Sequence, residues 1–267
     1  MTTNRIGVFG ANGRMGLALL EAATIKEQTQ LTGAYVRSSS SLLGINVNQI
    51  NSAADKNISF SDDSTIDNVD VLIDFTLPAG MKNHLKIALA HKIPMVIGTT
   101  GLTSDDMAQL HDAAKHIPIV FARNYSVGVN VLLNLVQTAA TKLGDDLDIE
   151  IFEAHHRHKV DAPSGTALAI GESIAHAKGW DHDEVAVYDR SQVETAKSQN
   201  EIGYSVLRGG DIVGEHTTYF ATMGERLELT HKASSRMTFA LGAIRAAGWL
   251  RNKPAGLYDM QDVLDLK

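Results

Sequence analysis

The sequence predicts an α/β protein that begins with a doubly wound parallel sheet and continues with an α+β domain built on an open mixed sheet. Three observations support this. Short apolar segments alternate with helical segments up to about residue 126, and a glycine-rich turn joins the first strand to the first helix. Beyond residue 185, several short segments alternate apolar and polar residues. We expect one domain from residues 1–126 with 236–267, and a second from residues 127–235.

Composition limits the classes of function. The formal net charge of −7 argues against a nucleic-acid-binding protein, which needs a basic surface. The chain has no cysteine, which excludes disulfides, thiolate nucleophiles and cysteine-based zinc sites and fits a reducing compartment. No segment is long and apolar enough for a signal peptide or a membrane span. We therefore expect a cytoplasmic protein with neither a nucleic-acid nor a membrane partner.

The first strand and helix enclose a dinucleotide-binding fingerprint. The apolar run Ile6–Phe9 leads into the sequence GANGRMG at residues 10–16, and Leu17–Ala23 has helical spacing. Such glycines permit a tight turn, a close approach of backbone to pyrophosphate, and packing of helix on strand, as in a Rossmann-type fold. The spacing GxxGxxG is less common than GxGxxG, so a turn without a ligand is the alternative.

The second strand, Leu31–Val36, bears on the choice of cofactor. A fingerprint for NAD places an acidic residue about 20 positions after the glycines, where it binds the ribose hydroxyls. Val36 occupies that region, and it is followed by Arg37 and the hydroxyl side chains of Ser38–Ser41. This arrangement suits a 2′-phosphate and favours NADPH, with NADH also accepted. The alternative is that Arg37 is a solvated loop charge.

The α/β alternation continues to residue 122. We expect strands at Val69–Phe75, Pro94–Ile97 and Ile117–Ala122, and helices at Ala79–Ala90 and Ser104–Lys115, the latter capped by Thr103 or Ser104. Ligands of such sheets bind at the carboxyl ends of the strands. The small residues of Gly98–Gly101 would let a nicotinamide ring lie close to the backbone, although a plain βα turn would use them too.

The second domain has a different pattern. Helices are expected at Val127–Leu143 and Ser164–Lys178. After the second domain, a further helix is expected at Met237–Leu250, which returns to pack on the first domain. A half-buried strand is expected at Asp148–Ala154. Segments that alternate like antiparallel strands follow at Val185–Tyr188, Ile202–Leu207, Ile212–Phe220 and Arg226–Thr230. The polar segment 189–200 is expected to be a mobile loop, and the open sheet predicts an oligomer.

The densest chemistry lies between residues 150 and 169. His155, His156, His158 and Lys159 lie within five positions, and Ser164 stands where a helix begins. Histidine exchanges protons near neutral pH, and a helix N-terminus binds anions. The combination predicts a small substrate that carries carboxylates. The alternatives are a charged loop or a metal site at His155 and His158. A metal is disfavoured because the chain lacks Cys and HExxH order, and Lys159 would repel a cation.

Seven motifs follow one another along the whole chain: GANGRMG at 10–16, IDFTLP at 73–78, VIGTTG at 96–101, NYSVGVN at 124–130, EAHHRHKVDAPSGTA at 153–167, GDIVGEHT at 210–217 and HKASSRMTFA at 231–240. In this order they resemble the dihydrodipicolinate reductase family of bacterial lysine biosynthesis. The chain departs from some members at Val36, where an acidic residue would favour NADH.

The resemblance implies an NAD(P)H-dependent reduction of the cyclic dicarboxylate 4-hydroxy-tetrahydrodipicolinate to tetrahydrodipicolinate by a homotetramer whose second domain closes over the cofactor domain. It implies that His155 is the acid/base residue and Lys159 the proton donor. The sequence alone does not decide which of the two delivers the proton, because their pKa values depend on burial. It implies substrate binding by His156, Gly165 and Thr166, assisted by Ser164 and Arg236. The implied cofactor-binding residues are Gly10, Ala11, Asn12, Gly13, Arg14, Met15, Arg37, Phe75, Gly98, Thr99, Thr100, Ala122, Arg123, Asn124 and Tyr125.

Two other functions remain open on the residues alone. A non-catalytic dinucleotide sensor would keep the glycine fingerprint but would not need His155, His156, Lys159 and Arg236 together. Another nicotinamide oxidoreductase acting on a different small acid would be compatible with the anion site.

Overall fold

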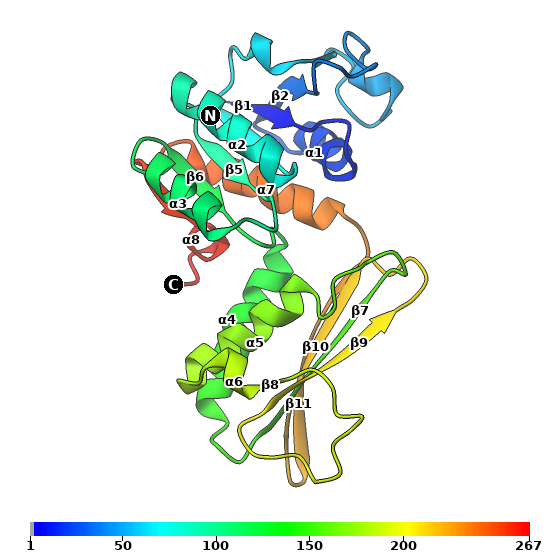
Figure 1. Ribbon diagram of the computed structural model, residues 1–267. Helices are drawn as coiled ribbons and strands as arrows, with labels where there is room; N and C mark the ends of the chain where they lie inside the picture. Colours follow the sequence, from blue (N-terminus) through cyan, green and yellow to red (C-terminus); the bar gives the residue numbers. More distant parts are fainter. Residues whose placement is uncertain (1–2) are drawn as a thin grey trace. The chain divides into compact units, whose positions relative to one another are not determined.

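The computed structural model describes residues 3–267, and the chain divides into two compact units. Unit 1 consists of Met1–Val127 and Arg236–Lys267, and unit 2 consists of Gly128–Ser235. The chain enters unit 2 in helix α4 (Val127–Lys142) and returns to unit 1 at helix α7 (Met237–Leu250), as can be followed in Figure 1.

Unit 1 contains a seven-stranded parallel sheet with the order β12-β6-β5-β4-β1-β2-β3. The predicted strands are confirmed as β1 (Asn4–Phe9), β2 (Thr29–Tyr35), β4 (Val71–Asp74), β5 (Met95–Ile97) and β6 (Pro118–Phe121). The two edge strands, β3 (Phe60–Ser61) and β12 (Gly256–Tyr258), were not predicted, because two or three residues show no period.

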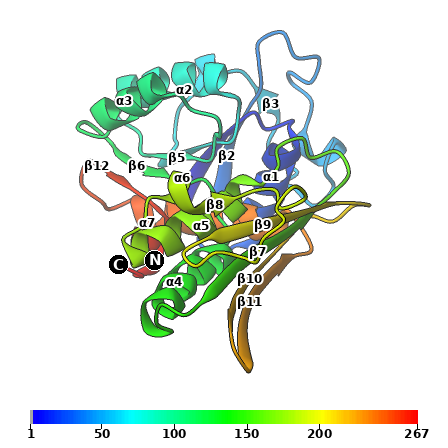
Figure 2. The ribbon, with the colours of Figure 1, turned by 60° about the horizontal axis from the view of Figure 1, so that its bottom comes forward.

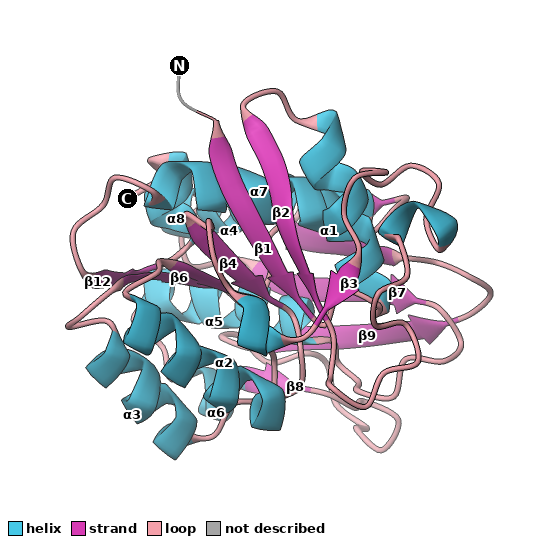
Figure 3. Ribbon diagram, turned by 90° about the horizontal axis from the view of Figure 1, so that it is seen from above, coloured by secondary structure: helices cyan, strands magenta, loops and turns pink. Residues whose placement is uncertain are grey.

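Helices cover both faces of this sheet, as Figure 3 shows. On one face, α1 (Arg14–Ile25) and α7 pack on Ile6, Val8 and Ile73, so the predicted return of the last long helix to the first domain is confirmed. On the other face, α2 (Pro78–His91) and α3 (Ser104–Ala113) pack on Leu72 and Met95. The short elements are η1 (Val47–Gln49), η2 (Asp63–Thr65) and α8 (Met260–Leu264).

The start of α3 shows how the sequence sets a helix boundary. The hydroxyl of Thr103 accepts a hydrogen bond from the Asp106 N–H at 3.2 Å, and the Asp106 carboxylate accepts one from the Thr103 N–H at 3.0 Å. This reciprocal pair satisfies two backbone donors that the helix itself leaves unpaired. Thr103 is therefore the N-cap, one of the two candidates predicted.

Unit 2 contains a five-stranded mixed sheet with the order β11-β10-β7-β9-β8. Its strands are β7 (Asp148–His155), β8 (Ala186–Val187), β9 (Ile202–Arg208), β10 (Gly214–Thr222) and β11 (Glu225–Ala233). β10 is antiparallel to β7 and β11, but β9 is parallel to both β7 and β8. The antiparallel prediction is wrong for β8 and β9, since alternation reports one covered face and not the direction of a strand.

One face of the mixed sheet is covered by α4, α5 (Gly165–Lys178) and α6 (His182–Val185), and Figures 1 and 2 agree on this arrangement. Their apolar side chains pack on Ile149, Ile151 and Phe220. The helix α6 was not predicted. Parallel pairing requires a crossover connection: α5 and α6 lie between β7 and β8, and the segment 188–201, which contains no helix, connects β8 to β9.

The segment 189–200 has no helix or strand. It is nevertheless attached to the sheet, because the Lys197 ammonium lies 2.6 Å from the Glu150 carboxylate and the Arg190 guanidinium lies 2.8 Å from the Glu201 carboxylate.

Candidate active site

The carboxyl end of β7 places two titratable side chains on the covered face of the mixed sheet. Side chains of a strand alternate between its faces, so Glu153 and His155 share the face of Ile149 and Ile151. Glu153 is 0% exposed and His155 is 8% exposed. Charged groups are buried at this level only when they are paired, so the partners of Glu153 define the site.

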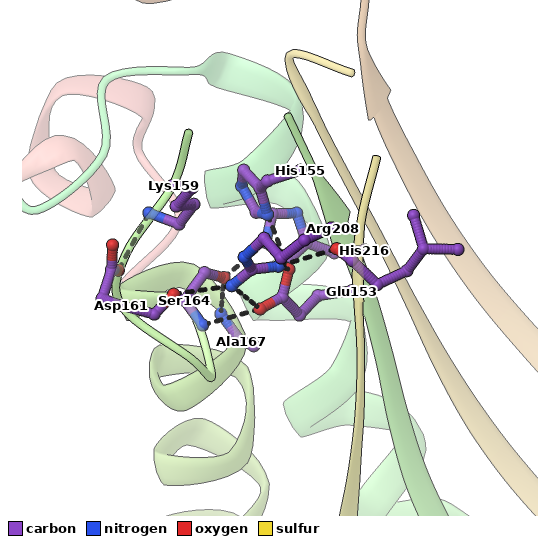
Figure 4. Close-up of polar contacts among 9 residues, drawn as sticks. Glu153, His155, Lys159, Asp161, Ser164, Ala167, Arg208 and His216 are labelled. Carbon is purple, nitrogen blue, oxygen red and sulfur yellow. Dashed lines mark hydrogen bonds and ion pairs between the residues drawn. The ribbon is translucent and has the colours of Figure 1, made fainter. Parts of the chain in front are cut away.

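Glu153 accepts four hydrogen bonds, as Figure 4 shows. One carboxylate oxygen lies 2.6 Å from His155 Nδ1 and 2.7 Å from one Arg208 guanidinium nitrogen. The other oxygen lies 2.9 Å from the Ser164 backbone nitrogen and 2.8 Å from the second Arg208 nitrogen. Burial alone would raise the pKa of Glu153, but the hydrogen bonds from His155 and Arg208 outweigh it and lower this pKa to about 2. Glu153 is therefore ionised at neutral pH.

This ionised carboxylate determines how His155 is oriented. A carboxylate only accepts hydrogen bonds, so the Nδ1 that contacts Glu153 carries the proton. The second ring nitrogen, Nε2, is then the nitrogen of a neutral ring that can accept a proton. A Cβ atom added at Gly214 would lie 3.1 Å from Nε2, so a glycine at this position keeps the atom accessible.

The N-terminus of α5 adjoins the same carboxylate. Ser164 is the N-cap, as predicted, and its hydroxyl accepts a hydrogen bond from the Ala167 N–H at 3.2 Å. Gly165 follows, and a Cβ added there would meet no atom within 4 Å. Backbone N–H groups and the helix dipole favour negative charge near a helix N-terminus.

His216 of β10 holds the Ser164 hydroxyl from the other side, with Nε2 3.0 Å from Oγ. Burial, together with the neighbouring His155, lowers the pKa of His216 to about 3. His216 is therefore neutral at physiological pH and adds no positive charge next to His155.

Lys159 lies in the turn between β7 and α5. Its ammonium is 2.9 Å from the Asp161 carboxylate, and its side chain is largely shielded from solvent. The backbone carbonyl of Asp161 accepts a hydrogen bond from Arg208 at 2.6 Å. The same arginine thus contacts both Glu153 and the turn that carries Lys159.

Unit 2 therefore contains most of the residues predicted to act on the substrate: His155, His156, Lys159, Ser164, Gly165 and Thr166. His156 is partly exposed, and its ring lies 6.3 Å from that of His158. Arg236 belongs to unit 1, at the start of α7.

Sequence reasoning assigned no role to Glu153, Arg208 or His216. The signal for Glu153 was available, because a strand places residues i and i+2 on one face, and His155 follows at that spacing. Arg208 is 55 residues away in the chain from Glu153, and His216 is 52 residues away from Ser164. Only the strand register, in which His155 pairs with Arg208 and Glu153 with His216, brings them there.

The residues predicted to bind the cofactor follow the carboxyl ends of neighbouring strands in unit 1. Phe9 pairs with Tyr35 and Asp74, Asp74 pairs with Ile97, and Ile97 pairs with Phe121, so these five strands end side by side. The candidates that follow these ends are Gly10–Met15, Arg37 (two residues after β2), Phe75, Gly98–Thr100 and Ala122–Tyr125.

The glycine turn fits the pyrophosphate of a dinucleotide. Gly10 has φ +62°, which favours glycine, and a Cβ at Gly16 would lie 2.2 Å from the Gly10 carbonyl oxygen. The N-cap of α1 is Gly13, which has no side chain to cap the helix, and no acidic residue lies in the first turn. The Ala11 N–H donates to the Tyr35 carbonyl and the Gly13 N–H to the Gly10 carbonyl, so the N–H groups suited to a negatively charged ligand are those of the first helical turn, residues 14–16.

The side chains of Phe75, Thr99 and Tyr125, three other cofactor-binding candidates of unit 1, differ in their contacts. A Cβ at Gly98 would lie 2.2 Å from the Phe75 ring, so the glycine lets the ring pack there. Thr99 is buried, and its hydroxyl has no hydrogen-bond partner among the described residues. The buried Tyr125 hydroxyl contacts the carbonyls of Ile97 and Val120, and burial raises the pKa of Tyr125 well above its usual value. Tyr125 therefore offers a ligand only its backbone.

Neither a membrane-spanning helix nor a metal-binding cluster is found among residues 3–267. No described helix is long and apolar enough to span a bilayer. No group of three or more His, Cys, Asp or Glu side chains is arranged to hold a metal ion within the described part of the chain.

Comparison with known proteins gives consistent matches over the whole chain. The family "Dihydrodipicolinate reductase, N-terminus" matches residues 4–125, and "Dihydrodipicolinate reductase, C-terminus" matches residues 128–264. The 4-hydroxy-tetrahydrodipicolinate reductase of Pseudoalteromonas translucida (strain TAC 125) is 83% identical over 267 residues, 100% of both chains. That of Pseudoalteromonas atlantica (strain T6c / ATCC BAA-1087) is 52% identical, with 98% of this chain and 99% of the relative covered.

Solved structures agree with the fold. The dipicolinate-bound dihydrodipicolinate reductase from Paenisporosarcina sp. TG-14 has a TM-score of 0.76 at 22% identity, and the match covers 98% of this chain and 99% of that one. An amine dehydrogenase from Mycobacterium smegmatis has a TM-score of 0.59 at 13% identity, with 95% and 94% covered. The predicted fold class and resemblance are confirmed: this chain belongs to the dihydrodipicolinate reductase family.

Proposed function

We propose that this chain reduces 4-hydroxy-2,3,4,5-tetrahydrodipicolinate to 2,3,4,5-tetrahydrodipicolinate with NAD(P)H, a step of diaminopimelate and lysine biosynthesis. Family membership and the shared name of relatives up to 83% identical support the reaction. The observation in the structure that carries it is the pairing of a proton-exchanging group, His155 Nε2, with the anion site at the start of α5.

Unit 1 is the proposed cofactor-binding unit. Its glycine turn would hold the pyrophosphate through Gly10–Met15, and the strand ends at Phe75, Gly98–Thr100 and Ala122–Tyr125 would surround the nicotinamide. The reduced nicotinamide, when bound, supplies the hydride. The unpartnered Thr99 hydroxyl is a donor and acceptor that a ligand would satisfy.

NADPH is the proposed preferred cofactor, with NADH also accepted. Arg37 is exposed just beyond the end of β2, where an adenosine ribose would lie, and none of residues 36–41 carries a carboxylate to bind a free 2′-hydroxyl. A guanidinium binds phosphate through charge-assisted hydrogen bonds.

The proposed substrate site is in unit 2. The N-terminus of α5, with Ser164, Gly165 and Thr166, would bind one carboxylate of the substrate, and His156 would assist. Lys159 or His155 would supply the proton that accompanies hydride transfer, since both carry exchangeable protons next to this anion site. Arg236 is proposed as a helper from unit 1.

The assembly is proposed to be a cytoplasmic homotetramer. In β11 most side chains are exposed, and Val206 and Leu227 are exposed apolar residues of the mixed sheet. A sheet with one face uncovered gains stability by burial against another subunit.

Parallel assays of NADPH and NADH oxidation, started by adding the substrate, test the reaction and the cofactor preference. For Arg37→Ala we expect KM for NADPH to rise about tenfold, as for the loss of one charge-assisted hydrogen bond, and KM for NADH to change little. A wild-type preference for NADH would contradict the role of Arg37.

The catalytic roles are tested with His155→Ala and Lys159→Ala. We expect each to lower kcat by about 100-fold, the lower range for proton transfer by a positioned side chain, with little change in cofactor affinity. His158→Ala is the matched control, because His158 is exposed in the same turn. Undiminished kcat in both variants would refute the assignment.

A further inference from the structure

We propose that Glu153 and Arg208 are positioning residues: Glu153 fixes the tautomer of His155 so that Nε2 faces the ligand, and Arg208 joins this histidine to the turn that carries Lys159. The inference rests on the proposed catalytic role of His155. Neither residue needs to touch the substrate, since both act through other groups.

The tautomer follows from the balance of donors and acceptors around Glu153. Its two oxygens face four donors, namely His155 Nδ1, the Ser164 backbone nitrogen and two Arg208 nitrogens, at 2.6 to 2.9 Å. Arg208 and a backbone amide cannot accept hydrogen bonds, so the carboxylate must accept from them. The remaining contact is satisfied only if His155 donates from Nδ1.

The surroundings of His155 Nε2 support the proposal that this nitrogen, and not Nδ1, exchanges a proton with the ligand. Gly214 of β10 leaves space next to this atom, because a Cβ there would approach it to 3.1 Å. The His216 ring lies edge-on to the His155 ring at 5.1 Å between centroids. The Nδ1 side of the imidazole is occupied by the Glu153 carboxylate, so Nε2 is the nitrogen left for a ligand.

Arg208 links three segments that are separate in the chain. It forms a two-point pair with Glu153 of β7, and a donor of the same guanidinium reaches the Asp161 carbonyl at 2.6 Å. The Asp161 side chain in turn lies 2.9 Å from the Lys159 ammonium. Glu153 itself holds the Ser164 N–H at the start of α5. One buried ion pair therefore sets the mutual positions of His155, Lys159 and the anion site.

Glu153→Gln gives a specific test because an amide has one acceptor and one donor end. Whichever way the amide is turned, its NH2 group meets one Arg208 nitrogen and either the Ser164 N–H or His155 Nδ1. The Ser164 amide cannot accept a hydrogen bond, whereas His155 can move its proton to Nε2 and accept at Nδ1. We expect the NH2 group to face His155 and the tautomer to switch.

The measurement is the 15N spectrum of histidine-labelled protein above the titration range, with the signals of His155 assigned by comparison with His155→Ala. We expect an Nδ1–H tautomer in the wild type and an Nε2–H tautomer in Glu153→Gln. We also expect kcat to fall about tenfold or more, because the wrong nitrogen carries the proton, with KM for the cofactor unchanged. Glu150→Gln is the matched control, since Glu150 is another ion-paired carboxylate of β7, 2.6 Å from Lys197.

The outcomes separate this inference from the proposed function. An Nε2–H tautomer in the wild type overturns the inference without any variant, so the test stands even if Glu153→Gln does not fold. Full kcat in a folded Glu153→Gln also overturns it when His155→Ala is inactive. If His155→Ala is fully active, the catalytic role of His155 fails, and the positioning inference fails with it, because it rests on that role. The tautomer of the wild type then shows separately whether His155 Nδ1 donates to Glu153.

Discussion

The buried His216 predicts a specific dependence of the stability of unit 2 on pH. His216 is 3% exposed, its Nε2 contacts Ser164, and its Nδ1 has no hydrogen-bond partner among the described residues. Its pKa is about 3 in the folded chain and about 6.5 without perturbation, chiefly because burial disfavours the charged ring. As the pH falls below 6.5, the unfolded chain binds a proton that the folded chain does not, so stability is lost down to pH 3.

The size of the effect follows from the two pKa values. Each unit of pH between them costs about 1.4 kcal/mol, so lowering the pH from 7.5 to 4 should remove about 3 kcal/mol from the free energy of unfolding. His216→Gln keeps a polar group for Ser164 but cannot titrate, so it should lack this loss. Glu153 also loses stabilisation below its unperturbed pKa of 4.5, because its folded pKa is about 2. That loss occurs in both proteins and cancels in the comparison.

The tryptophans allow unit 2 to be observed by itself. The chain has two, Trp180 in unit 2 and Trp249 in unit 1, so Trp249→Phe leaves Trp180 as the fluorescent reporter. Urea unfolding of this protein, with and without His216→Gln, would be followed at pH 7.5 and pH 4. We expect the variant to lose about 3 kcal/mol less than its parent over this interval. Losses equal within about 0.5 kcal/mol would refute the assignment of a neutral, buried His216.

Two glycines give further predictions. Gly16→Ala should abolish measurable NADPH binding in a fluorescence titration, because its Cβ would lie 2.2 Å from the Gly10 carbonyl oxygen and the turn would have to open. The control is Gly248→Ala, whose Cβ meets nothing within 4 Å and which should bind NADPH normally. Gly171→Ala should destabilise unit 2 by about 1–3 kcal/mol in the urea unfolding assay with Trp180 as reporter, because its Cβ would lie 1.7 Å from the Tyr204 hydroxyl oxygen. Adding Tyr204→Phe removes this oxygen and should restore part of the lost stability. No restoration would argue against this contact.

Much of unit 1 was predictable because its signals are local. Strands buried on both faces, such as Val71–Asp74, are continuous apolar runs, and the glycines of residues 10–16 fix a turn that a Cβ would block. Edge strands such as Phe60–Ser61 are too short to show any period. Their existence depends on a neighbouring strand that already presents free hydrogen-bonding groups.

The candidate site was predictable only in part, for a physical reason. His155, Lys159 and Ser164 follow one another closely in the chain, so the type of chemistry was visible in one stretch of sequence. Their mutual positions depend on Arg208, which reaches them through strand register. Whether a strand is parallel or antiparallel to its neighbour leaves no trace in its alternation, and the prediction for β9 failed at that point.

The discontinuous composition of unit 1 has a consequence for the order of folding during synthesis. Unit 2 is the single segment Gly128–Ser235, so the ribosome completes it before α7 is made. Until then, α1 and the sheet beneath it lack the cover provided by Ala243, Ala247 and Leu250, and β6 lacks its neighbour β12. Domains fold as units once their residues have emerged. We therefore expect unit 2 to fold first on the nascent chain and the sheet of unit 1 to be completed last, when both ends of the polypeptide meet.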